Sequence, residues 1–276
     1  MRERTTEVDG LPIRYLEAGE GPVVLLLHGA SLGSSADVFA RNLGPLAAGG
    51  LRAIAPDRPG YGRSGGPDDP TLAGHRRFAL GFLDALGLPS AVLVGHSQQA
   101  NTAAALALDQ PDRVPRAVVL GGGGLLPPVP GDDAAPGGGE RLTQEPTIEQ
   151  TRAHLEEDLY DHSLITPEAL ALRHAMSLGA PFAYYTRRAA GGPGGGGAAA
   201  GEPLWQRVGT HPERFLLLYG RQDKPTTAAR CARARELFPD LRLVLFDRCG
   251  HLVQWDQAEA FVRLTLAFVR DAVPAS

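Results

Sequence analysis

Runs of aliphatic residues, separated by stretches with helical spacing, dominate the first half of the chain. Val23–Leu27 is apolar throughout, and so are Val92–Val94 and Ala117–Leu120. A continuous aliphatic run of this length is typical of a strand that is buried on both faces of a parallel sheet. The pattern therefore predicts alternating strands and helices, with helices on both faces of one mostly parallel sheet.

Further elements complete this alternation, and one strand differs from the rest. Leu11–Glu17 alternates between polar and apolar residues, which predicts a half-exposed edge strand. The other predicted strands are 51–55, 215–219 and 241–246, and the predicted helices are 39–48, 71–86, 98–110, a stretch that ends at 237, and 257–269. The sheet is thus expected to resume after residue 213, and the sequence contains no internal repeat.

The stretch between the two parts of the sheet has a different character. Prolines and glycines extend from about Leu125 through Glu140. Helical patterns without an intervening strand then follow at 148–160, 167–178 and 182–189. We expect an inserted helical cap at 125–205, between the strands 117–120 and 215–219, and a core domain made of residues 1–124 and 206–276.

Residues 191–201 consist only of glycine, alanine and proline. Such a stretch buries too little surface to order itself, which favours a flexible connector. The alternative is a glycine-rich phosphate-binding loop. It is disfavoured because neither a Lys-Ser/Thr pair nor a strand-to-helix context accompanies the glycines.

Composition and charge exclude several classes of function. The 276 residues are 43% hydrophobic and 21% charged, with a net charge of -4, which argues against binding to nucleic acid or to an anionic membrane surface. No apolar run reaches membrane-spanning length, and the amino terminus lacks the apolar core of a signal peptide, so we expect a cytoplasmic protein. Cys231 and Cys249 form no zinc-like cluster and are expected to be free thiols; neither a metal nor a cofactor is predicted.

Ser97 occupies the most informative position in the chain. The apolar strand ends in Gly95-His96-Ser97 and turns at once into the small-residue helix that begins at Gln98. A strand that meets a helix without a loop forces a sharp, strained turn and holds the residue at its apex out for reaction. Such turns usually read Gly-x-Ser-x-Gly, but Gln99 replaces the second glycine. The alternative is an ordinary helix with Ser97 as its N-cap.

Two further residues complete a predicted constellation with Ser97. Asp223 follows the strand 215–219, and His251 follows the strand 241–246, so all three fall at the same edge of the sheet in the order serine, acid, histidine. A serine hydroxyl needs a base to take its proton; His251 can serve, and Asp223 would fix the tautomer of the imidazole. As alternatives, Asp223 could be a turn former and His251 a loop residue bonded to backbone.

The predicted oxyanion hole consists of two backbone N–H groups. One belongs to Gln98, which directly follows the nucleophile, and the other to Ala30, in the loop that follows His28 and Gly29. His28 is interpreted as structural, because a buried imidazole after a strand usually pins a loop through hydrogen bonds.

With these motifs in place, residues 23–122 and 213–271 resemble an α/β hydrolase. The resemblance implies an α/β-hydrolase fold with an eight-stranded, mostly parallel sheet. Residues 248–261 (RCGHLVQWDQAEAF), and 159–168 (LYDHSLITPE) followed by Arg173, further resemble the meta-cleavage-product hydrolases, which split carbon–carbon bonds in vinylogous diketones. By this resemblance Arg173 would reach from the cap to a substrate carboxylate or enolate, in a bidentate contact that lysine could not copy. Its alternative is a solvated helix arginine.

Three positions depart from the pattern of that family. The family usually has Asn before its serine, glycine two places after it, and Trp after the catalytic histidine; this chain has His96, Gln99 and Leu252 there. The Asn and Trp of the family help to hold the dienol substrate, whereas a histidine before the serine occurs in many esterases of the fold. The candidate substrate-binding residues are Gly29, His96, Arg173 and Leu252.

The sequence therefore favours a serine hydrolase that acts on a small, partly apolar, ketone-type substrate. The preferred reaction is hydrolysis of a carbon–carbon bond next to a ketone, and the runner-up is ester or lactone hydrolysis through an acyl-enzyme. A family member that has lost hydrolysis and serves as a cyclase, a lyase or a ligand-binding protein is a third alternative. Apart from the small-molecule substrate, the only partner considered is a second copy in a homodimer.

Overall fold

The computed structural model describes residues 1–67, 69–130, 142–190 and 202–271, with no side chains described for 188–190. Eight strands form one sheet in the order β1-β2-β4-β3-β5-β6-β7-β8. The strands are β1 (Arg2–Val8), β2 (Leu11–Ala18), β3 (Val23–Leu27), β4 (Arg52–Pro56), β5 (Val92–His96), β6 (Ala117–Leu120), β7 (Phe215–Gly220) and β8 (Arg242–Phe246). All neighbours from β4 to β8 are parallel, and β1 and β2 are antiparallel to their neighbours, so the predicted mostly parallel sheet is confirmed.

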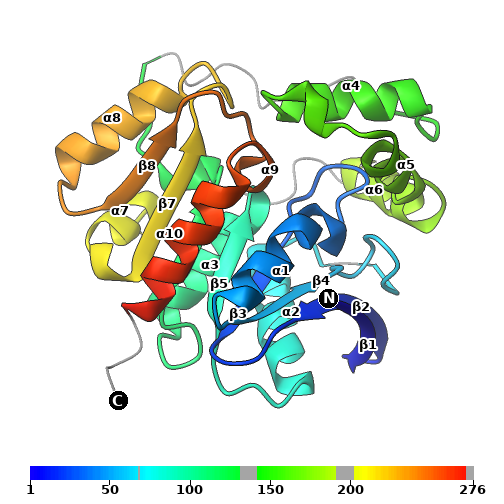
Figure 1. Ribbon diagram of the computed structural model, residues 1–276, viewed down its shortest axis with the longest axis horizontal. Coiled ribbons are helices and arrows are strands. Elements are labelled where there is room, and N and C mark those ends of the chain that lie inside the picture. Colours follow the sequence, from blue (N-terminus) through cyan, green and yellow to red (C-terminus); the bar gives the residue numbers. More distant parts are fainter. Residues whose placement is uncertain (68, 131–141, 191–201, 272–276) are drawn as a thin grey trace.

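Helices cover both faces of the sheet because successive residues of each central strand point to opposite sides. Leu25 and Leu27 of β3 belong to one buried cluster, and Val24 and Leu26 belong to the other. The first cluster includes side chains from α2 (Leu72–Ala85), α3 (Gln98–Asp109), α7 (Leu204–Gly209) and α8 (Thr227–Leu237). The second includes side chains from α1 (Ala40–Ala48), α9 (Val253–Asp256) and α10 (Ala258–Arg270), which lie together in Figure 1.

The prediction that Leu11–Glu17 forms an edge strand is wrong. β2 lies inside the sheet between β1 and β4, and β1 is the edge. A two-residue turn at Asp9-Gly10, with φ of 50° and 78°, joins β1 to β2 in the geometry that suits a hairpin. β1 escaped prediction because it is polar and largely exposed. The polar positions of β2 are buried instead in ion pairs, such as Arg14 with Asp37 and Asp57.

The elements that the structure describes between β6 and β7 are all helices, as predicted for this stretch. They are a short 3₁₀ helix η2 (Gly123–Leu125), α4 (Ile148–Asp158), a second 3₁₀ helix η3 (His162–Leu164), α5 (Pro167–Ala175), α6 (Ala180–Ala190), α7 and a third 3₁₀ helix η4 (Pro212–Arg214). Figure 1 shows α4, α5 and α6 gathered beside the sheet, whereas α7 lies near β7. The proposed connector at 191–201 lies outside the described residues.

Candidate active site

Ser97 stands at a strained turn between β5 and α3. Its φ of 56° and ψ of -117° lie in a region that side chains rarely adopt. Gly95 makes this turn possible, because a Cβ atom there would collide with the carbonyl oxygen of Gln99. The backbone N–H of Ser97 donates to the carbonyl oxygen of Leu120 at 2.8 Å, which ties the turn to the end of β6. This backbone has the form expected of a nucleophile elbow.

Asp223 and His251 come together at the carboxyl ends of β7 and β8. Nδ1 of His251 lies 3.0 Å from Oδ1 of Asp223, although the two residues are far apart in the sequence. Gly121, directly after β6, approaches the same pair: a Cβ atom there would lie 3.0 Å from Nδ1 of His251. The position after β6 thus faces His251 but carries no carboxylate, and Asp223 supplies it from β7.

The environment of His251 sets its basicity. Burial alone would lower the pKa of His251, but the carboxylate of Asp223 beside its ring, helped by the charge of Asp158, outweighs burial and raises this pKa above its ordinary value of 6.5. A raised pKa makes the neutral imidazole a stronger base. The pair therefore has the electrostatic character that proton abstraction from a hydroxyl requires.

The loop after β3 lies against the elbow. Nε2 of His28 accepts a hydrogen bond from the N–H of Arg58 at 3.0 Å, and Nδ1 lies 2.8 Å from the carbonyl oxygen of Gly29. Burial lowers the pKa of His28 well below its ordinary value, so its ring stays neutral. These contacts hold the loop in place, in agreement with the structural role predicted for His28. A Cβ atom on Gly29 would lie 3.1 Å from Cβ of Ser97. Ala30 and Gln98 therefore belong to segments that meet at Ser97; their role as oxyanion donors stays a prediction.

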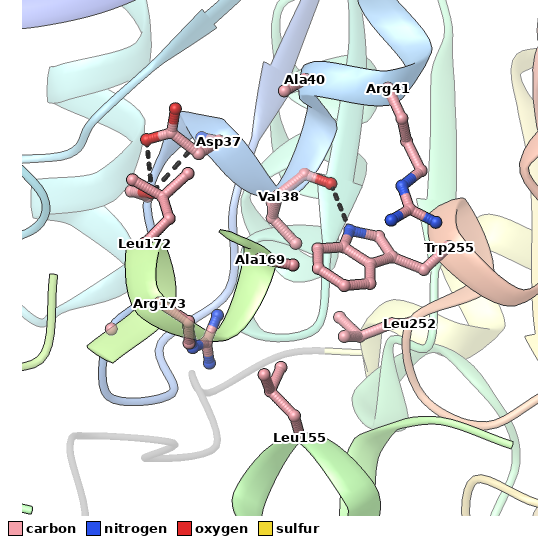
Figure 2. A pocket seen from close by; sticks show the side chains of 12 residues that line it. Asp37, Val38, Ala40, Arg41, Leu155, Ala169, Leu172, Arg173, Leu252 and Trp255 are labelled. Carbon is pink, nitrogen blue, oxygen red and sulfur yellow. Dashed lines mark hydrogen bonds between the residues drawn. The ribbon is translucent and has the colours of Figure 1, made fainter. Parts of the chain in front are cut away.

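Arg173 and Leu252 line a cavity of about 210 Å³ between the core and the helical insertion. Figure 2 shows Arg173 leaving α5 on the side of Leu155, with Leu252 nearby. The guanidinium of Arg173 has no hydrogen bond and no ion pair with any residue that the structure describes. Burial lowers the pKa of Arg173, and only the charge of Asp158 opposes this. An arginine that has no partner among the described residues and lines a largely apolar cavity could bind a carboxylate.

A set of backbone contacts fixes the insertion to the loop that carries His251. The carbonyl oxygen of Asp158 accepts hydrogen bonds from the N–H groups of His251 at 2.8 Å and Leu252 at 3.1 Å. The carboxylate of Asp256 accepts from Gly250 at 2.7 Å, and from Tyr160 and from Asp161 at 3.0 Å each.

These contacts were not predicted. Asp256 lies within the stretch 248–261 that carried the family resemblance, which was the available signal.

Comparisons with known proteins agree with this geometry. A family model described as the alpha/beta hydrolase fold matches residues 22–258. A 2-hydroxy-6-oxo-6-phenylhexa-2,4-dienoate hydrolase of Burkholderia cepacia is 32% identical over 269 residues, which cover 93% of this chain and 91% of that protein. The chain belongs to the α/β-hydrolase family, in the branch of the meta-cleavage-product hydrolases. It is accordingly an enzyme of the hydrolase class.

Two further relatives of this α/β hydrolase support the same branch. A 2-hydroxy-6-oxononadienedioate/2-hydroxy-6-oxononatrienedioate hydrolase of Pseudomonas putida is 33% identical, over 98% of this chain and 95% of that protein. The solved structure of a meta-cleavage product hydrolase from Pseudomonas fluorescens superposes with a TM-score of 0.76 at 28% identity, covering 98% of both chains. The predicted fold class is thereby confirmed.

His96 is the first departure of this α/β hydrolase from the usual pattern of its branch. Nε2 of His96 lies 3.2 Å from the carbonyl oxygen of His251, and the two rings are 4.8 Å apart. A carbonyl oxygen only accepts, so Nε2 carries the proton and Nδ1 is left as an acceptor. Nδ1 has no partner among the described residues, and a Cβ atom on Gly29 would lie 3.0 Å from it. Burial lowers the pKa of His96 well below its ordinary value, which keeps the ring neutral.

Gln99 is the second departure, and the structure gives it an unfavourable position. Its side chain is fully buried, and neither Oε1 nor Nε2 has a hydrogen-bond partner in the part of the chain that the structure describes. A buried polar group without a partner costs about 1–3 kcal/mol. The elbow therefore tolerates a bulky residue in place of glycine, but at a cost in stability.

Replacing Gln99 with methionine, which has a similar shape, is expected to raise the free energy of unfolding by about 1 kcal/mol, because the unpartnered amide is removed. Urea denaturation followed by circular dichroism measures this change. Gln110→Met, at the solvent-accessible end of the same helix, is the matched control and should leave stability unchanged. A loss of stability in Gln99→Met alone would show that the amide is bonded after all.

Cys231 and Cys249 are both free and buried, as expected, and burial raises the pKa of Cys231 to about 11. Within the described residues, no group of three or more histidines, cysteines or carboxylates could hold a metal ion. Among the same residues, none of the helices has both the length and the apolar character needed to cross a membrane.

Proposed function

We propose that this α/β hydrolase cleaves the carbon–carbon bond next to a ketone in a small dienoate that carries a carboxylate, as the names of its relatives describe for them. One observation carries the proposal. Arg173, without a hydrogen bond or ion pair among the described residues, lines the same cavity as Leu252, which directly follows His251. A carboxylate held at Arg173 would place the rest of a short substrate toward the loop of His251.

The reaction would begin at Ser97. His251 takes the proton of its hydroxyl, and the oxygen attacks the ketone carbon. The N–H groups of Gln98 and Ala30 would stabilise the oxyanion, each with about 3 kcal/mol. The carbon–carbon bond breaks from the 2-oxo tautomer of the substrate, in which the 2-hydroxyl proton has moved to the carbon beside the ketone. The electron pair of that bond then passes through the conjugated fragment to its 2-oxygen, and the fragment leaves as a dienolate that receives the proton from His251. His251 then takes a proton from water, and the hydroxide attacks the acyl carbon. The bond to the Ser97 oxygen breaks, this oxygen takes the proton back from His251, and the acid is released.

Arg173 and Asp223 would assist without forming bonds to the reacting carbon. Arg173 fixes the carboxylate end of the substrate through two parallel hydrogen bonds. Asp223 holds the tautomer of His251 and stabilises the imidazolium that forms. His96 would present the lone pair of Nδ1 to a hydroxyl group of the substrate, because its Nε2 proton is committed to the carbonyl oxygen of His251.

Ester or lactone hydrolysis is the second candidate. His96 before the nucleophile favours it, because a histidine at this position occurs in many esterases of the fold. A solved N-acyl homoserine lactone degrading enzyme also superposes with a TM-score of 0.67 at 26% identity over 96% of this chain. The same serine, histidine and oxyanion donors would perform that reaction.

Turnover of 2-hydroxy-6-oxo-6-phenylhexa-2,4-dienoate beside nitrophenyl acetate distinguishes the two candidates. Loss of the dienoate absorbance and release of nitrophenol report the two reactions in parallel. The proposal predicts a higher kcat/KM for the dienoate. Turnover of the ester alone would contradict carbon–carbon cleavage and favour the esterase.

Replacing Arg173 with methionine is expected to raise KM for the dienoate and to lower kcat/KM by about 100-fold, because a charge-assisted bidentate contact contributes roughly 1.5–3 kcal/mol. Nitrophenyl acetate has no carboxylate, so its turnover should change by less than about twofold. Arg152→Met, on the exposed face of α4, is the matched control. Equal losses for both substrates would mean that Arg173 supports the fold and does not read the carboxylate.

Three further predictions concern the role of the helical insertion, the location of the enzyme and its oligomeric state. Residues 125–205 would act as a cap over the site. A cytoplasmic location and a homodimer remain predictions from the sequence. Size-exclusion chromatography with light scattering measures the last of these.

A further inference from the structure

The cavity beside Arg173 contains a second arginine, which the reaction described above does not use. Arg41, at the start of α1, lines the same cavity. Figure 2 shows Arg41 and Arg173 on different sides of the view, with Val38, Ala169 and Trp255 drawn between them. Arg41 is exposed, whereas Arg173 is partly buried, so Arg41 marks the outer side of the cavity.

Arg41 is held in place without the use of its hydrogen-bond donors. Its guanidinium carbon lies 4.2 Å from the centre of the Trp255 ring, and Nε1 of Trp255 donates to the carbonyl oxygen of Val38 at 2.7 Å. A cation over an aromatic face is oriented by the ring, and its N–H groups stay available to an anion. The guanidinium of Arg41 has no hydrogen bond or ion pair with any described residue.

The nearby carboxylates do not neutralise Arg41. Asp37, which also lines the cavity, is engaged by Arg14 at 2.7 Å and by Ser35 at 3.0 Å. Asp256 accepts hydrogen bonds from three backbone N–H groups. Burial lowers the pKa of Arg41, and the charge of Asp256 opposes this only in part. The outer side of the cavity thus presents an oriented positive charge above an apolar lining.

We propose that Arg41, supported by Trp255, forms a second carboxylate-binding position at the outer side of this cavity, where anionic ligands are captured before their carboxylate reaches Arg173. The inference rests on the proposed function for the role of Arg173 as the inner position. The ligand class is a carboxylate with an apolar chain. The apolar part would pack on Val38, Leu155 and Trp255, between the two arginines.

Binding of phenylbutanoate and of phenylbutanol, measured by titration calorimetry, tests this position without requiring catalysis. The readout is the ratio of the two dissociation constants, which isolates the carboxylate from the apolar chain. In Arg41→Met the preference for the carboxylate should fall by about 3–10-fold at low salt, as expected for loss of a partly exposed charge. The loss should shrink at about 0.5 M salt, where exposed charges are screened.

Two variants make the outcome decisive. Arg41→Lys keeps the charge but loses the planar group that lies over Trp255, so it should recover only part of the preference. Arg233→Met removes an exposed arginine of α8 and should have no effect. If Arg41→Met failed to fold, Arg41→Gln would replace it. An unchanged preference in Arg41→Met, or a wild type that binds both ligands equally, would overturn the proposal.

The result is independent of the reaction type. An enzyme that fails to cleave the dienoate but still shows a carboxylate preference dependent on Arg41 would contradict the proposed function and leave the outer position supported. Cleavage of the dienoate, combined with an unchanged carboxylate preference in Arg41→Met, would support the proposed function and contradict the outer position.

Discussion

Replacing Ser97 with alanine is expected to lower kcat for the dienoate by roughly 10⁶, the order of loss when the nucleophile of such a triad is removed. In the proposed reaction the hydroxyl of Ser97 is the side-chain group that forms a bond to the substrate. Single-turnover absorbance measurements give the rate. Hydrolysis of nitrophenyl acetate by Ser97→Ala should also fall, because both reactions use the oxygen of Ser97.

The matched control is Ser90→Ala, which removes a hydroxyl just before β5 and should leave kcat unchanged. The stability of Ser97→Ala should also be close to that of the wild type, because alanine and serine meet the same backbone strain at a φ of 56°. An active, folded Ser97→Ala enzyme would contradict the assignment of the nucleophile.

Replacing Asp223 with asparagine is expected to lower kcat by about 10⁴, because the amide favours the wrong tautomer of His251. The pH profile should change as well. Asp223 raises the pKa of His251, whereas burial lowers it. Without the carboxylate this pKa falls, so the acidic limb of kcat/KM, which follows deprotonation of His251, should move to lower pH.

Asp247→Asn provides the control for this second variant. Asp247 lies just after β8 and pairs with Arg221 on the surface, so its replacement should change neither kcat nor the pH profile. A profile of Asp223→Asn that keeps the wild-type limb would mean that another group sets the basicity of His251.

The sequence was sufficient to predict the elements that carry Ser97, Asp223 and His251. Central strands of a parallel sheet are continuous aliphatic runs, so β3, β5, β6 and β7 were recognisable. The residues just after the strands then fall at one sheet edge, which is why Asp223 and His251 could be expected to meet. The distance of 3.0 Å between Nδ1 of His251 and Oδ1 of Asp223 agrees with that expectation.

Features that depend on long-range packing could not be predicted. β1 is polar and is held by pairing with β2, so its residues carry no hydrophobic signal. In the sequence Arg41 has the features of a residue on a helix surface. Its contact with Trp255, more than 200 positions later, follows only from the tertiary packing. The Asp256 contacts likewise join segments about 95 residues apart, which no local periodicity reports. The buried amide of Gln99 follows from the packing of α3 against the sheet.

Covalent labelling of the folded enzyme with a fluorophosphonate, followed by mass mapping, shows whether His251 activates Ser97. A serine activated by His251 attacks phosphorus and keeps the label. We expect one adduct, on Ser97, that is absent from Ser97→Ala and forms more slowly in Asp223→Asn. An enzyme that turns over the dienoate while Ser97 stays unlabelled would contradict this expectation.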